Sequence, residues 1–451
     1  MVEKVDVVVV GMGPGGEAAA TELAKAGLSV IGIESRLVGG ECPYYGCIPS
    51  KMMVRAANAL AEAGRVSILA GEVDITTDFA PVAKRIRDEA TDNWNDQVAV
   101  DRFEQAGGRF IRGTAVVTGP KTVRVGDLEL EAGTAIVLNT GTDPAVPPIP
   151  GLAGTPFWTN REAIAVTEVP SSLIVLGGGA IGLEMAQAFA RFGTNVQVLE
   201  ALDRLMPLEE PESSQLVADV LSSEGLGIHT GTAARNVSYE SNTFTVTSDD
   251  ETFSADHLLV ATGRRSDFAG LGLATVGVDT TSRVLDTDAN LQITDGVYAI
   301  GDITGKGAFT HMSMYQARIV ATHILGKQGP AAEYHAVPRV TFTDPEVGSV
   351  GLTEQQARDQ GITVGVAMSQ IPESSRGWLH KAGNEGLIKL VADTDKGILV
   401  GATSIGPAGG EVLSMLTLAV HERTPVSRLR EMIYAYPTFH RAVEDALGRL
   451  L

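Results

Sequence analysis

Two stretches of the chain repeat the same order of apolar and polar positions. Each begins with a continuous run of apolar residues, Val7–Val10 and Leu173–Leu176, as expected of a parallel strand buried on both faces. Each run is followed by a glycine-rich turn, a helical pattern and a second apolar strand that ends at a glutamate. This order predicts two doubly wound α/β units of Rossmann type within one chain.

The glycines of both turns have the G-x-G-x-x-G spacing, which lets backbone N–H groups approach a pyrophosphate at a helix N-terminus. They are Gly11, Gly13 and Gly16 in the first turn and Gly177, Gly179 and Gly182 in the second. Glu34 and Glu200 each follow the first glycine by 23 positions (34 − 11 and 200 − 177), close to the spacing of a ribose-binding carboxylate. Two complete fingerprints predict two dinucleotides. The alternative, a duplicated fold with one inactive copy, does not require both acids.

The remaining pattern is more varied. Residues 52–100 are predicted to be helical with a charged face, and residues 108–140 to form short strands. From about Glu333 onward the pattern predicts an α+β domain with an antiparallel sheet and helices at Glu354, Gly410 and Ser427. Its predicted strands are Arg339–Thr343, Gly348–Gly351, Thr363–Met368, Gly386–Val391 and Gly397–Ser404.

Length and charge narrow the class of protein. A chain of 451 residues is expected to hold two to four domains. Its net charge of −20 argues against binding nucleic acid or an anionic membrane. No apolar run reaches the length of a membrane span, and the first strand begins too early to leave room for a signal peptide. We therefore expect a cytoplasmic protein, in which a disulfide would cycle rather than persist.

The chain has only two cysteines, Cys42 and Cys47, in the segment GGECPYYGCIPSK that ends at Lys51. A helical pattern opens after Cys47, and a helix N-terminus favours a thiolate at that position. Cys42 is near enough to close a small disulfide ring. A structural zinc site needs about four ligands, and the first histidine is His229, so zinc is disfavoured. A redox pair is favoured over two inert buried thiols.

This segment resembles the active-disulfide segment of the class I pyridine nucleotide-disulfide oxidoreductases, whose pattern is G-G-x-C-x-x-x-G-C-x-P-[ST]-K. Dihydrolipoamide dehydrogenase, glutathione reductase and mercuric reductase belong to that family. The resemblance implies that the first fingerprint holds FAD and the second a nicotinamide cofactor. Glu200 would bind the free ribose hydroxyls of NADH and repel the 2′-phosphate of NADPH, whereas Arg204 would weaken that preference.

Other positions match family motifs, and each implies a role. Lys51 would pair with Glu184 beside the flavin, and His311 would either approach the flavin or only pack at a helix start. Two turns that follow apolar strands, at residues 140–142 and 262–264, match turns of the family, and residues 296–302 match its late flavin motif. These segments supply the remaining cofactor positions, which are Thr140, Gly141, Gly263, Gly301 and Asp302. The implied domains are an FAD-binding domain in two segments (1–149 and 268–334), an NAD(P)-binding domain (150–267) and a C-terminal dimerisation domain (335–451).

The C-terminus departs from the family pattern. Disulfide-reducing members carry a histidine before a proline and a glutamate five residues after the histidine, whereas this chain has Tyr436 and Arg441. The usual proton shuttle is therefore absent. If Pro437 begins the last helix, His440 and Glu444 lie on one face and could form a replacement dyad. A surface histidine in a charged terminal helix is the favoured alternative.

The sequence thus predicts a homodimeric, FAD-dependent NAD(P)H oxidoreductase that passes electrons through a Cys42–Cys47 disulfide to a small thiol, disulfide or related acceptor. Dihydrolipoamide dehydrogenase is the alternative nearest in activity, and a metal ion or a quinone are alternative acceptors. A sensor of NADH or redox state is the alternative outside enzymes. Steady NADH oxidation by an acceptor would distinguish the enzyme from the sensor.

Overall fold

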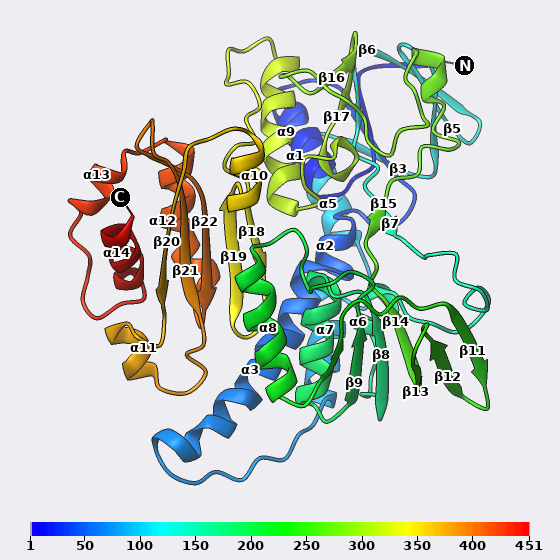
Figure 1. The fold of residues 1–451 in the computed structure, drawn as a ribbon. Coiled ribbons are helices and arrows are strands. Elements are labelled where there is room, and N and C mark those ends of the chain that lie inside the picture. The colour runs from blue at the N-terminus through cyan, green and yellow to red at the C-terminus, as the bar shows by residue number, and fades with distance from the viewer. Residues whose placement is uncertain (1, 451) are drawn as a thin grey trace. The chain divides into compact units, whose positions relative to one another are not determined.

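The computed structural model describes residues 2–450, which separate into two compact units, each assembled from distant stretches of the chain (Figure 1). Unit 1 comprises the chain up to Pro49, Lys84–Ala145 and Arg264–Tyr334. Unit 2 comprises Ser50–Ala83, Val146–Gly263 and the chain from His335 onward.

Unit 1 is built on a sheet with the strand order β16-β17-β6-β1-β2-β3, which is parallel from β17 to β3. The strands of unit 1, in which β7 and β15 form a separate pair, are β1 (Val2–Val10), β2 (Val30–Glu34), β3 (Arg109–Arg112), β4 (Ala115–Gly119), β5 (Thr122–Val125), β6 (Leu128–Leu138), β7 (Asp143–Pro144), β15 (Arg264–Arg265), β16 (Gln292–Thr294) and β17 (Val297–Ala299). Its helical segments are α1 (Pro14–Lys25), α2 (Glu41–Tyr44), the π-helical turn η1 (Ile86–Ala90), α5 (Gln97–Gln105), the 3₁₀ turns η2 (Leu273–Val276) and η3 (Gly301–Thr304), and α9 (Thr310–Ile324).

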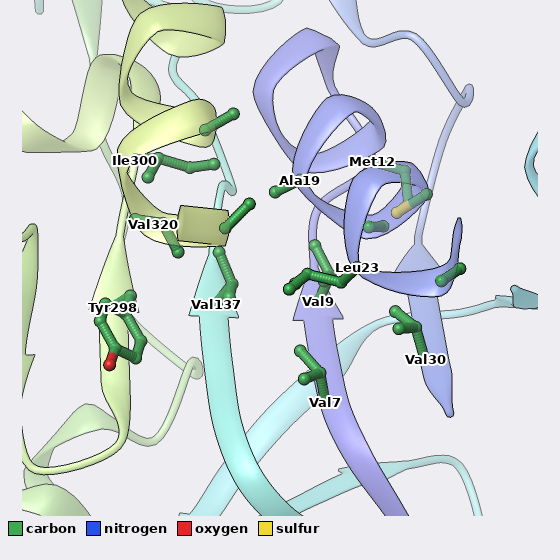
Figure 2. Close-up of a cluster of buried hydrophobic side chains, with 14 of the residues drawn as sticks. Val7, Val9, Met12, Ala19, Leu23, Val30, Val137, Tyr298, Ile300 and Val320 are labelled. Atoms are coloured by element: carbon green, nitrogen blue, oxygen red, sulfur yellow. The ribbon is translucent and has the colours of Figure 1, made fainter. Parts of the chain in front are cut away.

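One face of this sheet forms a core with helices α1 and α9. Figure 2 shows Val7 and Val9 of β1 and Val137 of β6 beneath Leu23 of α1 and Val320 of α9. These strand residues are fully buried. This burial agrees with the continuous apolar runs, which predicted parallel strands covered on both faces. The packing fixes α1 and α9 on the same face, so that both helix N-termini lie at the carboxyl ends of the strands, where α/β sheets bind ligands.

Unit 2 contains a second parallel sheet, with the order β10-β9-β8-β14, a three-stranded sheet, β11-β12-β13, and an antiparallel sheet, β18-β19-β22-β21-β20. Its strands are β8 (Ser172–Leu176), β9 (Asn195–Leu199), β10 (Gly227–His229), β11 (Asn236–Glu240), β12 (Thr243–Thr247), β13 (Thr252–Ala255), β14 (His257–Val260), β18 (Pro338–Thr341), β19 (Glu346–Gly351), β20 (Val364–Gln370), β21 (Leu387–Asp393) and β22 (Ile398–Gly406). Its helices are α6 (Asn160–Ala165), α7 (Ala180–Arg191), α8 (Pro211–Ser223), α10 (Glu354–Asp359), α11 (Ser375–His380), α12 (Gly409–His421), α13 (Val426–Arg430) and α14 (His440–Arg449).

Two helices continue from one unit into the other. They are α3 (Cys47–Leu69) and α4 (Ala80–Arg85). The helices predicted in residues 52–100 are α3, α4, η1 and α5, and residues 70–79 and 91–96 between them form neither helix nor strand. Gly71 has φ +137°, a conformation outside the helical region, and it ends α3.

Both doubly wound sheets and the C-terminal antiparallel sheet confirm the predicted fold class. The apolar strand predicted to end at Glu200 is β9, whose last residue is Leu199. Among residues 2–450, no helix combines the length and apolarity needed to cross a membrane.

Candidate active site

The first glycine-rich turn of unit 1 joins β1 to α1. Gly11 has φ +92°, and a Cβ there would lie 2.3 Å from the carbonyl oxygen of Asn139. A Cβ at Gly16 would lie 2.0 Å from the carbonyl oxygen of Gly11, so both positions require glycine. Gly13 precedes the helix without a side-chain cap. The first N–H groups of α1 therefore have no side chain of the N-cap residue to bind, which suits a phosphate at this end.

Glu34, at the end of β2, stabilises this turn. Its carboxylate accepts hydrogen bonds from the backbone N–H of Met12, at 2.9 Å, and of Arg36, at 2.7 Å. The acid that the spacing identified thus lies next to the middle of the glycine turn, where a ribose of a dinucleotide would lie.

Unit 2 repeats this arrangement in its parallel sheet. Gly177, with φ +110°, follows β8, and Gly179 precedes α7 without a side-chain cap. Glu200, which is 9% exposed, accepts hydrogen bonds from the N–H groups of Gly178 at 2.6 Å and Leu202 at 2.8 Å. These partners occupy the same positions relative to the turn as Met12 and Arg36 do in unit 1. Both turns therefore have the geometry of a dinucleotide site.

Arg204 does not extend toward the ribose carboxylate. Its guanidinium donates to the carbonyl oxygens of Glu209, at 2.9 Å, and Pro207, at 2.6 Å, and to the hydroxyl of Ser214, at 2.8 Å. The predicted competition of Arg204 for a 2′-phosphate therefore has no support in the contacts of this side chain.

The two cysteines lie together in unit 1. Cys42 belongs to the short helix α2, and Cys47 is the first residue of α3, which confirms its predicted place at a helix N-terminus. Both are free thiols, and the thiol of Cys42 hydrogen-bonds to Cys47. This hydrogen bond and partial burial raise the pKa of Cys42 well above its ordinary range. The structure thus describes the dithiol form of the predicted pair.

Thr310, the first residue of α9, completes this group. Its hydroxyl lies 3.4 Å from the sulfur of Cys47 and acts on Cys42 in the direction of a lower pKa. Sequence reasoning missed Thr310 because a threonine at a helix start is common. His311, the next residue, is exposed and stacks on Phe309, with 5.1 Å between ring centroids.

The late flavin motif also lies in unit 1. Asp302 accepts a hydrogen bond from the hydroxyl of Thr142 at 2.6 Å, and Arg264 donates to the same hydroxyl at 2.8 Å. Thr140 and Gly141 directly precede Thr142, and Gly301, with φ +79°, directly precedes Asp302. The turn after β6 and the turn after β17 thus meet at one group of polar side chains.

Asn139 was not identified from the sequence. It is buried, its amide donates to the carbonyl of Gly11 at 3.3 Å, and its carbonyl accepts from Ser313 of α9 at 3.1 Å. Gln316 of α9 accepts from the N–H of Gly301 at 2.7 Å. The sequence signal for Asn139 is a polar residue directly after the apolar strand β6, because a buried amide must be hydrogen-bonded, whereas Gln316 lies within α9 and has no such signal.

A charged pair in unit 2 matches the predicted contact. The ammonium group of Lys51 lies 2.6 Å from the carboxylate of Glu184, which is 5% exposed. The second oxygen of Glu184 accepts the backbone N–H of Phe342 at 2.9 Å, and the ammonium lies 4.6 Å from the centroid of the Phe342 ring. Backbone and aromatic ring therefore hold the pair from the side of β18, a contribution that the sequence did not reveal.

The C-terminal residues differ from the prediction. Helix α14 begins at His440 and not at Pro437, because residues 435–438 form a turn in which Thr438 donates to the carbonyl of Ala435. Glu444 forms an ion pair with Arg441, so the structure does not support a His440–Glu444 dyad. The guanidinium of Arg441 also lies 5.7 Å from the ring centroid of Tyr436, which is 69% exposed.

Among the described residues, no group of three or more histidine, cysteine or acidic side chains is arranged to hold a metal ion. The two neighbouring thiols of unit 1 can exchange with disulfides beside a dinucleotide-binding turn. A protein with two such turns and a vicinal dithiol has the parts of a flavoprotein disulfide oxidoreductase.

Comparison with known proteins supports this class. Residues 5–317 match the pyridine nucleotide-disulphide oxidoreductase family, and residues 337–447 match the dimerisation domain of that family. The chain belongs to the pyridine nucleotide-disulphide oxidoreductases, a family of NAD(P)H-dependent flavoproteins that use FAD and a pyridine nucleotide.

Individual relatives have several activities. The chain is 34% identical over 98% of its length to a dihydrolipoyl dehydrogenase of Chlorobaculum tepidum, of which 96% is covered. It is 33% identical over 98% of its length to a mercuric reductase of Streptomyces lividans, of which 95% is covered. The fold is similar to the Cu(II) complex of RclA, an HOCl-induced flavoprotein disulfide reductase of Escherichia coli, with TM-score 0.87, 28% identity and 99% of each chain covered.

Proposed function

We propose that this protein uses NADH and FAD to reduce a small-molecule acceptor through Cys42 and Cys47. FAD, when bound, supplies the relay that takes hydride from a nicotinamide and gives an electron pair to sulfur. The observation that carries the proposal is the contact between Cys42 of α2 and Cys47 at the start of α3, in the unit that also contains the first glycine turn. A vicinal dithiol in this setting can transfer two electrons and close to a disulfide.

The first turn and the pair Thr142 and Asp302 are assigned to FAD, and the second turn to NADH. Glu200 is buried beside the second turn, where its charge would oppose the 2′-phosphate of NADPH. Arg204 supports the NADH preference because its donors are bound to oxygens of residues 206–214.

The domains are assigned on the same basis. They are an FAD-binding domain (1–149 and 268–334), an NAD-binding domain (150–267) and a dimerisation domain (335–451). The match to a family dimerisation domain supports a homodimer. The thiols suit the reducing cytoplasm, which we propose as the location of the protein.

The residues of the chain then have separable roles. Cys42 attacks the acceptor, and Cys47 closes the disulfide by attacking Cys42. Thr310 holds the dithiol by its hydroxyl, 3.4 Å from Cys47. Lys51 and Glu184 provide a paired positive and negative charge for the flavin site, and Phe342 keeps Glu184 in place through its N–H group.

The acceptor is proposed to differ from dihydrolipoamide. Oxidation of a dithiol needs a base, and at this C-terminus a Tyr436–Arg441 contact stands where the family has histidine and glutamate. A small disulfide suits the chemistry of Cys42. A soft metal ion is the second candidate, because thiolates bind soft metals and the relatives include a mercuric reductase and a protein solved with Cu(II).

The test is reduction of the cysteine pair by NADH. The oxidised, flavin-loaded protein is incubated with NADH without oxygen, and new thiols are counted by alkylation and mass spectrometry. We expect two new thiols in the wild type, and a long-wavelength absorption of a Cys47 thiolate beside the flavin. Cys42→Ser should show that absorption without NADH, and Cys47→Ser should lack it.

The outcome also separates the enzyme from a sensor. Bound cofactor and no reduction of the cysteine pair would overturn the proposal. Reduction of the pair without continued NADH oxidation by any disulfide, metal ion or quinone would favour a sensor of NADH.

A further inference from the structure

A cavity of about 930 Å³ in unit 1 has Cys42 in its wall. Helix α1, the segment around α2, residues 88–99 and the first turn of α9 surround it. Figure 2 shows Ala19 and Leu23 of α1 directed into the core, and the other face of that helix contributes Glu22 to the cavity. The volume is that of a pocket for an organic molecule and is much larger than a metal ion requires.

The segment that contributes Asp92 to the cavity wall has an unusual backbone that is firmly held. Asp92, Asn93 and Trp94 have φ of +46°, +54° and +56°, and three such residues in succession are uncommon outside glycine. The N–H of Trp94 donates to the hydroxyl of the buried Thr91 at 3.3 Å, and its ring stacks on Tyr45, with 6.3 Å between centroids. Strain of this kind is retained where the surroundings impose it, often beside a functional site.

The same wall is fastened to the cysteine loop by Asp96. Its carboxylate accepts the N–H of Val38 at 2.7 Å, and the hydroxyl of Tyr44 donates to the carbonyl of Val38 at 3.1 Å. The two tyrosines between the cysteines depart from the small residues usual in the family pattern. Tyr45 stacks on Trp94, and Tyr44 holds the loop through Val38, whose N–H is bound by Asp96. Asp92 is therefore held at a fixed place in the cavity wall.

The charges that face the cavity favour neither carboxylates nor phosphates. Of its two cationic residues, Arg102 is bound by Glu17 through its Nε at 2.8 Å, which leaves Lys25. Glu22 and Asp92 oppose that single cation. Besides Glu17, Glu22 and Asp92, two more acids line the cavity, and both are neutralised by cations that do not line it. They are Asp88, bound to Lys84 and Arg87, and Glu89, bound to Arg85.

We propose that this cavity binds an uncharged or cationic organic disulfide and that Glu22 and Asp92 exclude disulfides that carry carboxylates. The inference rests on the function proposed above and specifies its acceptor. An anionic disulfide would meet two acids and one lysine in a protein of net charge −20, and it would have no arginine free to bind its carboxylates.

The reaction balances within the protein and the substrate. The sulfur of Cys42 attacks one sulfur of R–S–S–R and its proton passes to the departing sulfur, which forms a Cys42–S–S–R mixed disulfide and releases RSH. Cys47 then attacks the sulfur of Cys42, gives its proton to the second departing sulfur, releases the second RSH and closes the Cys42–Cys47 disulfide. Two electrons pass from the dithiol to the substrate, and the two cysteine protons leave with the two RSH products. NADH supplies the electron pair that restores the dithiol.

The experiment measures oxidation of the dithiol directly. The protein is reduced with dithiothreitol, freed of reductant and mixed in a stopped-flow instrument with cystamine, bis(2-hydroxyethyl) disulfide or 3,3′-dithiodipropionate. Each rate is divided by the rate of the same disulfide with free dithiothreitol, which removes intrinsic reactivity. At low salt, we expect the cationic and neutral probes to react at least about 10-fold faster than the dianion. High salt should reduce that ratio.

Charge reversal tests the named acids. Glu22→Lys with Asp92→Lys should lower the ratio of cationic to anionic rates at least about 10-fold. The matched control, Glu104→Lys with Asp127→Lys, makes the same change of net charge on exposed residues outside the cavity and should leave the ratio unchanged. Faster reaction of the dianion with the wild type, or an equal shift in both double variants, would overturn the inference. Reduction of the cysteine pair by NADH is measured separately, so its failure would count against the proposed function instead.

Discussion

At the residue scale, the two ribose carboxylates show what spacing alone can establish. Glu34 and Glu200 were identified by their distance from the first glycine, and each binds the N–H of the second residue of its turn. The partners of Arg204 were not predictable, because they are carbonyl groups and a serine whose positions depend on the loop after β9. Phe342 was missed for a similar reason, since it acts through its backbone N–H group.

Glu200 is expected to determine the choice of nicotinamide cofactor. The wild type should prefer NADH in kcat/KM, and Glu200→Ala should lose roughly 1–3 kcal/mol of discrimination, the scale of a hydrogen bond to a charged group. The measurement is kcat/KM for NADH and NADPH in both proteins. Glu34→Ala is the matched control, because it removes the same contact from the first turn and should leave the NADH to NADPH ratio unchanged. A wild-type preference for NADPH would contradict the assignment.

At the element scale, the apolar strands and the C-terminal antiparallel strands were predicted, whereas one short sheet and the start of one helix were not. Val7–Val10 of β1 and Leu173–Leu176 of β8 are buried on two faces, so their sequences are continuous apolar runs. The sheet β11-β12-β13 was missed because its strands are only four or five residues long, which makes their apolar pattern short. The start of α14 was misplaced by three residues, because Pro437 is a common first helical residue but here lies in the preceding turn.

Tyr436 and Arg441, which stand where the family has histidine and glutamate, are expected to make the oxidation of dihydrolipoamide slow. A positioned base contributes about 10²–10⁴-fold, and the exposed phenol of Tyr436 near Arg441 is a poor base at neutral pH. Wild type should therefore oxidise dihydrolipoamide weakly with NAD. Tyr436→His with Arg441→Glu, which recreates the family residues, should raise kcat/KM at least about 10-fold.

Two single variants serve as controls for that measurement. Tyr436→Phe and His440→Ala should have little effect across pH, because Glu444 is bound to Arg441 rather than to His440. A fall of roughly 10²-fold in His440→Ala alone would assign the base to His440. A wild-type kcat/KM above about 10⁶ M⁻¹s⁻¹ would show that the family dyad is not needed.

At the scale of the whole molecule, the order of nucleotide segments was predictable and the contacts that join them were not. The sequence indicated a chain that leaves the first nucleotide fold, forms a second and returns, and unit 1 contains both the early and the late stretches. Within unit 2, the parallel and antiparallel sheets are joined by polar contacts between residues far apart in sequence. Lys389 of β21 is 2% exposed and binds Glu210, which is 179 positions away. Pattern and spacing carry no signal for such a contact.

Lys389 is expected to be essential for the stability of unit 2. Its ammonium group lies 3.0 Å from Glu210, 2.8 Å from Glu212 and 3.1 Å from Glu354, so it links β21 to α8 and α10. Lys389→Met would leave Glu210, which is 4% exposed, without its cation. Breaking a buried ion pair in this way costs roughly 3–5 kcal/mol in the free energy of unfolding, because a buried charge loses its partner.

Denaturant unfolding followed by tryptophan fluorescence would measure this loss. Lys4→Met is the matched control, because Lys4 is 77% exposed and its ion-pair partner Glu131 is 38% exposed, so this pair lies on the surface. Screening by water limits such pairs to about 0–1 kcal/mol, so the control should unfold at nearly the wild-type denaturant concentration. A loss of less than about 1 kcal/mol in Lys389→Met would mean that Glu210 takes up a proton or reaches water when its partner is removed. The cluster would then not be what joins the two sheets, and apolar packing between them would have to account for the stability of unit 2.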